Sequence, residues 1–251
     1  MLLADFGEPG QRRLSASHAA VLGCGALGTV ASEQLARAGV GRITIIDRDV
    51  VEWTNLQRQT LFDERHAAEG TPKAVAAAER LRLVNSSIQI EPIVADVRPG
   101  NIESLLNLAA SDGLAPRAGV VIDATDNFQT RYLLNDVCVK HALPWVYGGA
   151  IGTRGMQATF LPALGGACLR CAFPVDSAAP IAGGDTCDTV GVLAGVAGIV
   201  ASCQAIEALK ILLGRADLCS TTLLDMDPWK GERRRVDLAS ARDPRCPCCV
   251  Q

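Results

Sequence analysis

Short apolar runs alternate with segments of helical periodicity through the first 150 residues of the chain. Each run is a few residues long and is bounded by glycine or polar positions, which predicts buried strands. These strands are expected over 19–22, 42–46, 88–94, 119–122 and 144–148. Helical spacing of apolar residues predicts helices over 26–38, 73–84, 101–110 and 127–141. Strands that alternate with helices are typical of an α/β fold with a doubly wound, mostly parallel sheet.

The pattern changes after residue 149. The elements predicted there are antiparallel strands over 154–161, 221–226 and 233–238 and a long helix over 189–214. The small residues of 176–184 predict a mobile loop. No internal repeat or linker interrupts the chain, so we expect one domain over 1–251 with two halves, 1–149 and 150–251.

Composition and charge exclude several classes of protein. A net charge of −3 argues against a nucleic-acid-binding surface, which usually carries a basic excess. The N-terminus has no signal-peptide pattern, so the ten cysteines are interpreted as thiols or metal ligands of a cytoplasmic protein. The longest apolar run, 190–203, is shorter than the roughly 20 residues of a membrane span. It is therefore predicted to be a buried core helix.

Two cysteine pairs have the spacing of metal ligands. Cys168 and Cys171 form one pair, and Cys246 and Cys249 form the other, about 75 positions further on. A two-residue spacer lets both sulfurs of a pair reach one ion, and two pairs complete a structural four-thiolate zinc site. The metal would then join the C-terminal tail to the middle of the fold. Cys248 could replace either cysteine of the second pair, and incidental cysteines or a redox pair are the alternative.

A glycine-rich turn follows the first predicted strand. Gly23, Gly25 and Gly28 open the helix over 26–38, and Asp47 ends the next strand. Glycines let the backbone approach a ligand, the helix N-terminus favours anionic groups, and Asp47 can accept from ribose hydroxyls. The turn therefore predicts a Rossmann-like nucleotide-binding fold. This pattern alone suggests a dinucleotide dehydrogenase.

Two further features favour ATP as the nucleotide. A polar stretch and a lysine beyond it provide possible donors to a triphosphate, namely Asn55, Arg58, Gln59 and Lys73. Asp126 and Asn127 follow the predicted strand 119–122, at the strand end where ligands bind in open α/β sheets. Asp126 there could hold the magnesium ion that a triphosphate needs.

These motifs together resemble a known family. Gly-Cys-Gly-Ala-Leu-Gly, Ile-Ile-Asp-Arg-Asp-Val-Val-Glu-Trp-Thr-Asn-Leu-Gln-Arg-Gln, Thr-Pro-Lys-Ala, Asp-Ala-Thr-Asp-Asn and the two CxxC pairs occur in that order. They resemble the ThiF/MoeB/HesA family, the bacterial relatives of ubiquitin-activating enzymes, from about residue 6 to residue 249. The resemblance implies a homodimer that adenylates the C-terminal carboxylate of a small ubiquitin-like sulfur-carrier protein ending in Gly-Gly.

The resemblance also implies roles for individual residues. The three glycines would line the ATP, Asp47 would hold its ribose, and Asp126 its magnesium. The phosphates would contact Asn55, Arg58 and Lys73. Of these, Arg58, Lys73 and Asp126 are expected to contribute to catalysis, because bringing a carboxylate to a phosphate is mostly positioning and charge neutralisation. The half 1–149 is then expected to bind nucleotide, and the half 150–251 to bind the carrier and the zinc.

A cysteine near the second half's long helix is a further candidate. The corresponding cysteine takes part in sulfur or acyl transfer in some members of this family, which makes Cys187 a possible nucleophile. A helix N-terminus lowers the pKa of a thiol, but Asp185 and Asp188 beside it would raise it again. With no appended sulfurtransferase domain expected, sulfur would come from a separate donor such as a cysteine desulfurase or a rhodanese.

The N-terminal segment departs from the family pattern. Members usually begin with Arg-Tyr-x-Arg-Gln, whose arginine reaches the neighbouring subunit's nucleotide site. This chain starts at Met1, just past that segment, and Arg12 and Arg13 do not match it. The missing arginine leaves open a non-catalytic scaffold that binds ATP and zinc. Two further alternatives are adenylation of another acyl group, such as a peptide or a tRNA-bound carboxylate, and a nicotinamide dehydrogenase.

Overall fold

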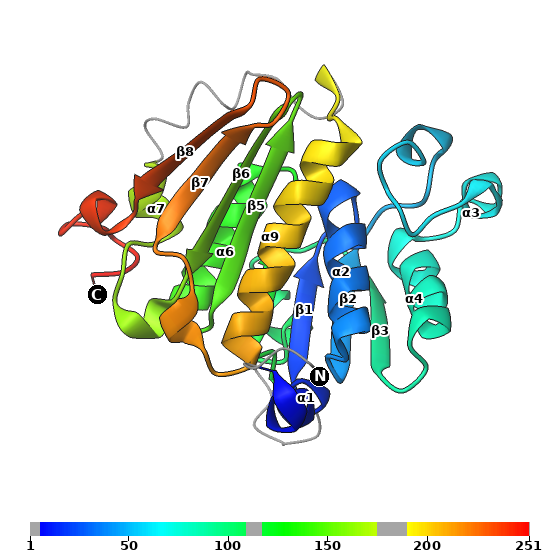
Figure 1. Cartoon of the computed structure of the whole chain (residues 1–251), viewed down its shortest axis with the longest axis horizontal. Coiled ribbons are helices and arrows are strands. Elements are labelled where there is room, and N and C mark those ends of the chain that lie inside the picture. Colours follow the sequence, from blue (N-terminus) through cyan, green and yellow to red (C-terminus); the bar gives the residue numbers. More distant parts are fainter. Residues whose placement is uncertain (1–5, 109–116, 175–189, 251) are drawn as a thin grey trace.

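The computed structural model describes residues 6–108, 117–174 and 190–250. Its centre is an eight-stranded sheet in the order β3-β2-β1-β4-β5-β6-β7-β8 (Figure 1). The strands are β1 (His18–Leu22), β2 (Arg42–Asp47), β3 (Gln89–Val94), β4 (Val120–Asp123), β5 (Trp145–Ile151), β6 (Arg154–Phe160), β7 (Thr222–Asp227) and β8 (Glu232–Asp237). The first five strands pair in parallel and the last three pair antiparallel. The predicted doubly wound sheet with antiparallel C-terminal strands is confirmed.

Helices cover both faces of this sheet. They are α1 (Gly7–Ser15), α2 (Ala26–Ala38), α3 (Glu64–Glu69), α4 (Lys73–Val84), α5 (Ile102–Leu105), α6 (Phe128–Lys140), α7 (Leu169–Ala172) and α9 (Ala194–Leu212). Short 3-10 turns are η1 (Trp53–Asn55), η2 (Pro162–Leu164), η4 (Ala216–Leu218) and η5 (Ala239–Ala241). Helices α2, α4 and α9 lie in front of the sheet in Figure 1, and α6 lies behind it.

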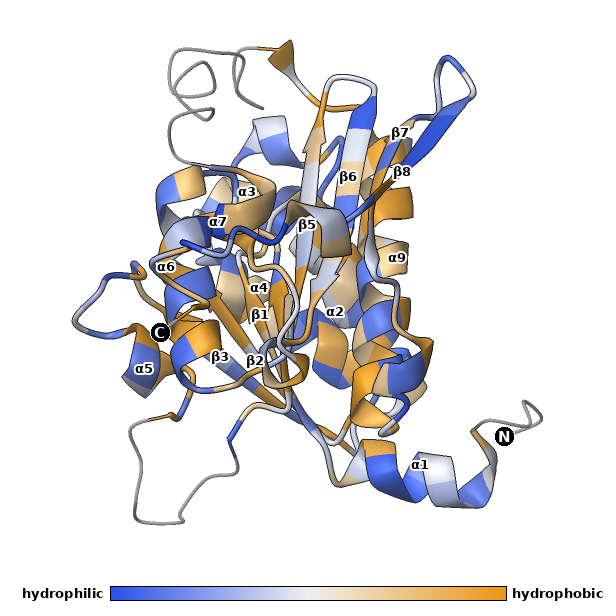
Figure 2. Ribbon diagram, turned by 90° about the vertical axis from the view of Figure 1, so that its left-hand side faces the viewer, coloured by the Kyte–Doolittle hydropathy of each residue, from blue (hydrophilic) through white to orange (hydrophobic). Residues whose placement is uncertain are grey.

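Each face of the sheet has its own hydrophobic core. Leu35, Ile45 and Val200 belong to the core beneath α2, α4 and α9. Trp145 and Phe160 stack at 4.7 Å in the core on the opposite face. Figure 2 shows hydrophobic residues on the central strands and hydrophilic residues on the hairpin of β7 and β8. The carboxyl ends of β1, β2 and β4 are therefore held in place by packing on both faces of the sheet.

Two predicted helices are shorter than the periodicity indicated. The helix expected over 101–110 ends at Leu105, and Asn107 has a positive φ of 55° that a continuing helix does not allow. The helix expected over 189–214 begins at Ala194, because Gly191 has φ of 76° and Val192 instead pairs with Gly152 in a β-bridge. The loop predicted over 176–184 falls outside the described residues.

Helix α9 is long and apolar enough to cross a membrane by length and composition. In the structure it instead packs along β4, β5 and β6 and beside α2. Val200 and Ala201 are fully buried, and Gln204 donates from Nε2 to the backbone oxygens of Asp123 and Val146 at 2.6 and 3.1 Å. The prediction of a core helix is therefore confirmed.

Candidate functional site

The three glycines in the turn after β1 have different steric surroundings. Gly23 has φ of 90°, and a Cβ there would lie 2.6 Å from the backbone oxygen of Ala124. A Cβ on Gly28 would lie 2.0 Å from the backbone oxygen of Gly23, so this position must be glycine for α2 to pack on the turn. A Cβ on Gly25 would meet only Gln59 Nε2, at 3.8 Å. Gly25 therefore leaves open space beside the backbone, as a bound ligand requires.

The N-terminus of α2 carries no side-chain cap. Its N-cap residue is Gly25, and the first helical hydrogen bonds include Thr29 N to the Gly25 oxygen at 3.1 Å. The first amides of an α-helix have no partner within the helix, and they carry the positive end of its dipole. The open space at Gly25 and these amides together form a site suited to phosphate oxygens.

Asp47 ties the end of β2 to the glycine turn. Its Oδ2 accepts from the backbone N–H of Cys24 at 2.6 Å, and its Oδ1 accepts from the backbone N–H of Asp49 at 2.8 Å. Burial raises the pKa of Asp47, while the two backbone hydrogen bonds and the charge of Lys73 act in the opposite direction. The carboxylate lies at the edge of the turn where the sequence predicts a ribose.

Lys73 is brought to the same place by the start of α4. Its side chain is only 10% exposed, and Nζ lies 3.0 Å from Oδ2 of Asp49. Its backbone N–H also donates to the Asp49 oxygen at 2.9 Å. A hydrogen-bonded chain therefore runs from Cys24 through Asp47 and Asp49 to Lys73. Sequence reasoning missed Asp49, although a second acidic residue two positions after Asp47 was a visible signal.

The polar stretch around η1 is only partly gathered at this site. Gln59 is 4% exposed and points toward Gly25, and its Oε1 has no hydrogen-bond partner among the described residues. Asn55 is 6% exposed and accepts from the Glu52 N–H at 3.0 Å, which completes the capping box of η1. Arg58 donates from Nη1 to the Thr54 oxygen at 2.9 Å. The structure thus places Gln59 at the glycine turn and holds Arg58 against its own loop.

Asp126 and Asn127 follow β4 and begin α6. Both are exposed, and the Asn127 side chain caps α6 by accepting from Thr130 N at 2.8 Å. At this edge of the sheet Arg48 pairs with Asp96 at 3.0 Å and with Asp49 at 3.6 Å, and the charges of Asp96, Asp49 and Asp126 raise the pKa of its guanidinium. Magnesium is usually held by one or two carboxylates together with substrate phosphates, and an exposed Asp126 at this edge fits that donor set.

A buried polar network lies directly beneath this loop. Asp123, at the end of β4, is fully buried, and its Oδ1 accepts from the Thr125 N–H at 3.0 Å and the Thr125 hydroxyl at 2.7 Å. Arg131 of α6 is 7% exposed, and its Nε lies 3.4 Å from Asp123 Oδ2. Burial raises the pKa of Asp123, and Arg131 opposes that shift. Sequence reasoning missed this pair because an arginine is usually expected at the surface, although Arg131 shares the helical spacing of buried Leu134 and Cys138.

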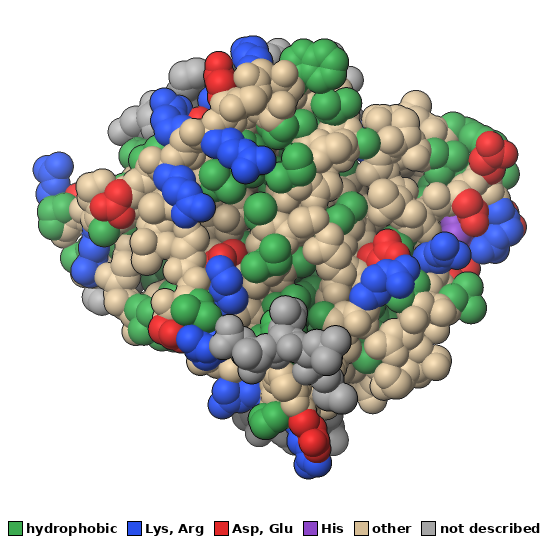
Figure 3. Space-filling view, viewed as in Figure 1, with side chains coloured by type: hydrophobic (Ala, Val, Ile, Leu, Met, Phe, Trp, Pro, Cys, Tyr) green, Lys and Arg blue, Asp and Glu red, His purple; other side chains and the backbone are tan. Residues whose placement is uncertain are grey.

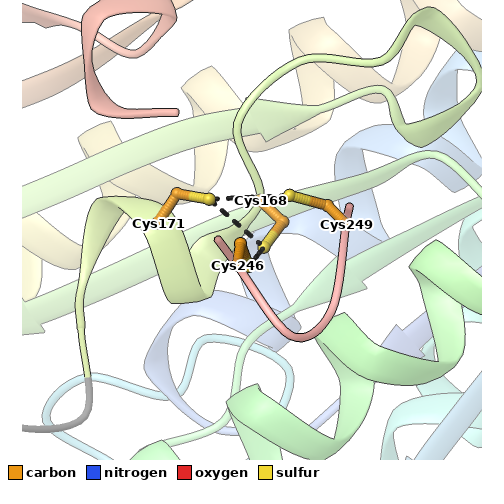
Figure 4. A group of neighbouring side chains, drawn as sticks. All are labelled: Cys168, Cys171, Cys246 and Cys249. Atoms are coloured by element: carbon orange, nitrogen blue, oxygen red, sulfur yellow. Dashed lines mark hydrogen bonds between the residues drawn. The ribbon is translucent and has the colours of Figure 1, made fainter. Parts of the chain in front are cut away.

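The four predicted zinc ligands come together where α7 meets the C-terminal tail of the chain. The sulfurs of Cys168, Cys171, Cys246 and Cys249 all lie within 4.8 Å of one another (Figure 4). Sulfur–sulfur distances are 3.9 Å for Cys168 to Cys171 and 3.6 Å for both Cys168 to Cys246 and Cys171 to Cys249. A tetrahedral ion with Zn–S bonds of about 2.3 Å requires sulfur–sulfur edges of about 3.8 Å. The cluster therefore fits zinc in a closed, four-thiolate geometry.

Cys248 lies beside this cluster but outside the set of four. Its Sγ accepts from Asn135 Nδ2 at 3.2 Å. Asn135 is fully buried on α6, and its Oδ1 accepts from the Leu169 N–H at 2.8 Å, which holds the first cysteine turn in place. A hydrogen bond with Cys248 lowers the pKa of Cys168 to about 4, in the direction that favours a thiolate ligand. Arg170 and Asp136 add a bidentate ion pair at 2.7 and 2.6 Å.

Cys187 and its two acidic neighbours fall outside the described residues. Its proposed part as a nucleophile therefore remains a prediction from the sequence.

Comparison with known proteins finds relatives along nearly the whole chain. A model of the ThiF family matches residues 1–248. The sulfur carrier protein ThiS adenylyltransferase of Bacillus subtilis is 42% identical over 248 residues, which cover 99% of this chain and 69% of that protein. The SAMP-activating enzyme E1 of Haloferax volcanii is 39% identical over 250 residues, which cover 99% of this chain and 86% of that protein.

The fold also matches solved structures. The crystal structure of MccB from E. coli with ATP superposes with a TM-score of 0.78 over 95% of this chain and 68% of that chain, at 23% identity. At that level of identity the match shows a shared fold and no more.

Proposed function

The chain belongs to the ThiF family, and from this premise we propose that it is an ATP-dependent adenylyltransferase. Its substrate would be the C-terminal Gly-Gly carboxylate of a small ubiquitin-like sulfur-carrier protein. The products would be the acyl-adenylate and pyrophosphate, for later conversion to a thiocarboxylate. The observation that carries the proposal is the uncapped N-terminus of α2 beside the open Gly25, with the ammonium of Lys73 held nearby through Asp49 and Asp47.

Different residues of the site would contact different parts of ATP. The α2 amides and the glycine turn would cradle phosphates, and Asp47 would accept from the ribose hydroxyls. Lys73 would exchange its contact with Asp49 for the phosphates, and Arg58 would leave the Thr54 carbonyl to do the same. Asn55, Gln59 and Asn127 would line the pocket with amide groups. Each cation that moves onto the phosphates lowers the repulsion met by an incoming carboxylate.

The adenylation step needs no general base. The carrier carboxylate is already ionised near neutral pH, since carboxyl pKa values lie near 4. It would attack the α-phosphorus, form one P–O bond, and displace pyrophosphate, which takes away the electron pair of the broken bond. Catalysis would therefore consist of alignment and charge neutralisation by Lys73 and Arg58. Magnesium held by Asp126 would supply further charge neutralisation at the phosphates.

The cysteine cluster would hold a zinc ion in a structural position. Four thiolates fill a tetrahedral ion, which leaves no position for water or substrate. The zinc would join α7 to the C-terminal tail, and no chemical step passes through it. We place the nucleotide site in the half 1–149 and the carrier and zinc sites in the half 150–251. Sulfur would come from a separate cytoplasmic donor, such as a cysteine desulfurase or a rhodanese.

We further propose that two copies of the chain form a homodimer through the outer stripe of α9. This stripe is defined by Gly195, Ile199, Cys203 and Ile206, of which Ile206 is 53% exposed. Beside it lies a cavity of about 240 Å³, lined in part by Leu218 and Ile206. In Figure 3, which has α9 in front as in Figure 1, hydrophobic side chains gather over the middle of this face. A face of this kind marks a protein–protein contact.

The test is ATP–pyrophosphate exchange by the purified chain, with and without a carrier protein ending in Gly-Gly. Exchange that depends on the carrier is the expected result. Lys73→Met should lower its rate about a hundredfold or more, because a charged phosphate contact of the transition state is lost. Lys140→Met is the matched control. This lysine is exposed, pairs with Glu103 at 2.8 Å and ends α6, whereas Asp126 and Asn127 lie at the beginning of that helix, so the rate should not change.

Other outcomes of the same assay identify the alternatives. Exchange that requires a peptide or an aminoacyl-tRNA instead of the carrier would overturn the carrier proposal in favour of another acyl substrate. ATP binding without exchange, even when an N-terminal extension carrying the family arginine is added, would indicate a scaffold. Binding of NADH in place of ATP would indicate a dehydrogenase.

A further inference from the structure

We propose that Arg131 and Asp123 form a buried positioning pair that holds the loop carrying Asp126, and that this pair sets the magnesium affinity of the site. Arg131 donates to the backbone oxygens of Thr125 and Gly148, so its role in this proposal is to position the loop between β4 and α6. The magnesium readout rests on the proposed function, whereas the loop readout does not. Neither the sequence pattern nor the residues expected to bind ATP include Arg131.

The pair is buried, and Asp123 Oδ2 and Arg131 Nε face each other at 3.4 Å as an ion pair without a hydrogen bond between them. Asp123 is fully buried, and one of its carboxylate oxygens accepts from both the backbone and the hydroxyl of Thr125. Arg131 donates from Nη2 to the Thr125 oxygen at 2.5 Å and to the Gly148 oxygen at 3.3 Å. The two charged groups therefore hold Thr125 from both its N–H and its C=O. Thr125 immediately precedes Asp126, so the direction in which Asp126 leaves the sheet is determined by these contacts.

The same loop forms the floor of the glycine turn. A Cβ on Gly23 would lie 2.6 Å from the backbone oxygen of Ala124, and one on Gly28 would lie 3.4 Å from the Ala124 side chain. Ala124 N also donates to the Leu22 oxygen at 2.8 Å. A shift of residues 124–126 would therefore move the surface under the phosphates together with the magnesium carboxylate.

The surroundings require a planar guanidinium. The Arg131 guanidinium carbon lies 5.0 Å from the ring centre of Phe128 and 5.1 Å from that of Tyr147. An arginine can stack on rings and donate in several directions at once, while a lysine ammonium is a compact point charge. On the other side of β4, Gln204 of α9 binds the backbone oxygens of Asp123 and Val146. The end of β4 is thus held from both faces of the sheet.

Stability alone does not explain a buried ion pair here. Removing two charges from water costs several kcal/mol per ion, and apolar replacements are often neutral or stabilising. Three hydrogen bonds of this pair hold Thr125, next to a candidate metal carboxylate, and another anchors Arg131 to β5, which is better explained by positioning.

Arg131→Lys tests the pair while keeping the charge. Hydrogen–deuterium exchange of the full chain should show faster exchange at the amides of Thr125 and Asp126, by about tenfold. Arg42→Lys is the matched control, because Arg42 is also largely buried and pairs with Glu91 at 2.7 Å, at the opposite end of the sheet. It should leave residues 123–127 unchanged. Unchanged exchange at Thr125 in Arg131→Lys would overturn the proposal.

The second readout is the magnesium concentration that gives half-maximal pyrophosphate exchange. Arg131→Lys should raise it roughly ten- to a hundredfold, as loss of outer-shell partners does at metal sites, and Arg42→Lys should not. An equal loss of rate at every magnesium concentration contradicts the proposal. If the unaltered chain shows no exchange at all, the proposed function fails, and the loop measurement still decides the positioning pair.

A milder variant keeps the proposal testable if Arg131→Lys does not fold. Thr125→Val removes the 2.7 Å hydrogen bond from the Thr125 hydroxyl to Asp123 and leaves Arg131 in place. It should change both readouts in the same direction by a smaller factor. If Arg131→Lys does not fold, an unaltered magnesium dependence and unaltered loop exchange in Thr125→Val refute the positioning pair.

Discussion

At the residue scale, one short glycine motif combines two unrelated constraints. Gly28 is glycine because the helix must pack on the turn, where a Cβ would lie 2.0 Å from the Gly23 oxygen. Gly25 is glycine although the folded chain has room for a Cβ. The first constraint concerns the fold and the second concerns a ligand, and substitution separates them.

Gly28→Ala should destabilise the fold, and Gly25→Ala should leave it intact. Overpacking typically costs about 1–3 kcal/mol, which lowers the melting temperature by several degrees in a domain of this size, roughly 2–4 °C per kcal/mol. Gly25→Ala should instead weaken ATP binding roughly ten- to a hundredfold, because it blocks amide contacts to phosphate. Thermal unfolding and ATP titration of both variants provide the measurements. Equal effects of the two substitutions on stability would contradict this division of roles.

At the element scale, the cysteine cluster connects segments that share little other packing. Short helix α7 follows Cys168, while the tail around Cys246 has no regular helix or strand of its own. The small core of this region contains Cys168, Cys171 and Cys246, with only a few partly buried neighbours. A metal ion that joins them would therefore supply most of the order of the tail.

Cys249→Ser should abolish the bound zinc and destabilise the protein, whereas Cys248→Ser should keep the zinc. Loss of a ligand removes metal-binding energy from folding, and we expect a fall in melting temperature of about 10 °C. Metal analysis of the purified variants and thermal unfolding test this. Cys248 is the matched control because it lies beside the same cluster, where it contacts Cys168 and accepts from Asn135, yet stands outside the set of four sulfurs. Zinc loss in Cys248→Ser with retention in Cys249→Ser would reverse the ligand assignment.

At the scale of the whole molecule, α9 has two different faces. Its inner face packs on the sheet, and Gln204 there is fully buried. Its outer stripe exposes Ile206 at 53% and Ile199 at 37%. The neighbouring 3-10 turn η4 adds Leu218, exposed at 45%. A second copy that covers this stripe would remove these side chains from water, which is the driving force we propose for the dimer.

Ile206→Glu should convert the dimer to a monomer, because two like charges would then face an apolar contact. Leu83→Glu is the matched control, because Leu83 is 81% exposed on α4 and does not belong to the stripe on α9. Sedimentation of both variants measures the mass of the assembly. A dimeric Ile206→Glu, or a chain that is monomeric without any substitution, would contradict the dimer through α9.

Much of the fold was determined by local sequence. The bounds of α2 and α4 agree with their predicted ranges, because their apolar spacing and flanking residues act within one turn of helix. The glycine turn and the cysteine pairs were also visible, since each depends on a spacing of two to five positions. The shortened α9 shows the limit: Gly191 takes a positive φ so that Val192 can pair with Gly152, a contact between distant segments.

Tertiary structure alone decided how these pieces meet. The order of the strands places β4 beside β1, and this brings the Ala124 backbone against Gly23. It also buries Arg131 against Asp123 and places Asp49 on Lys73. Such contacts join residues from different elements, and their cost or benefit depends on burial and on partners that no local pattern encodes. The sequence therefore determined the elements and the chemical groups, and the packing of the sheet decided which groups hold the others in place.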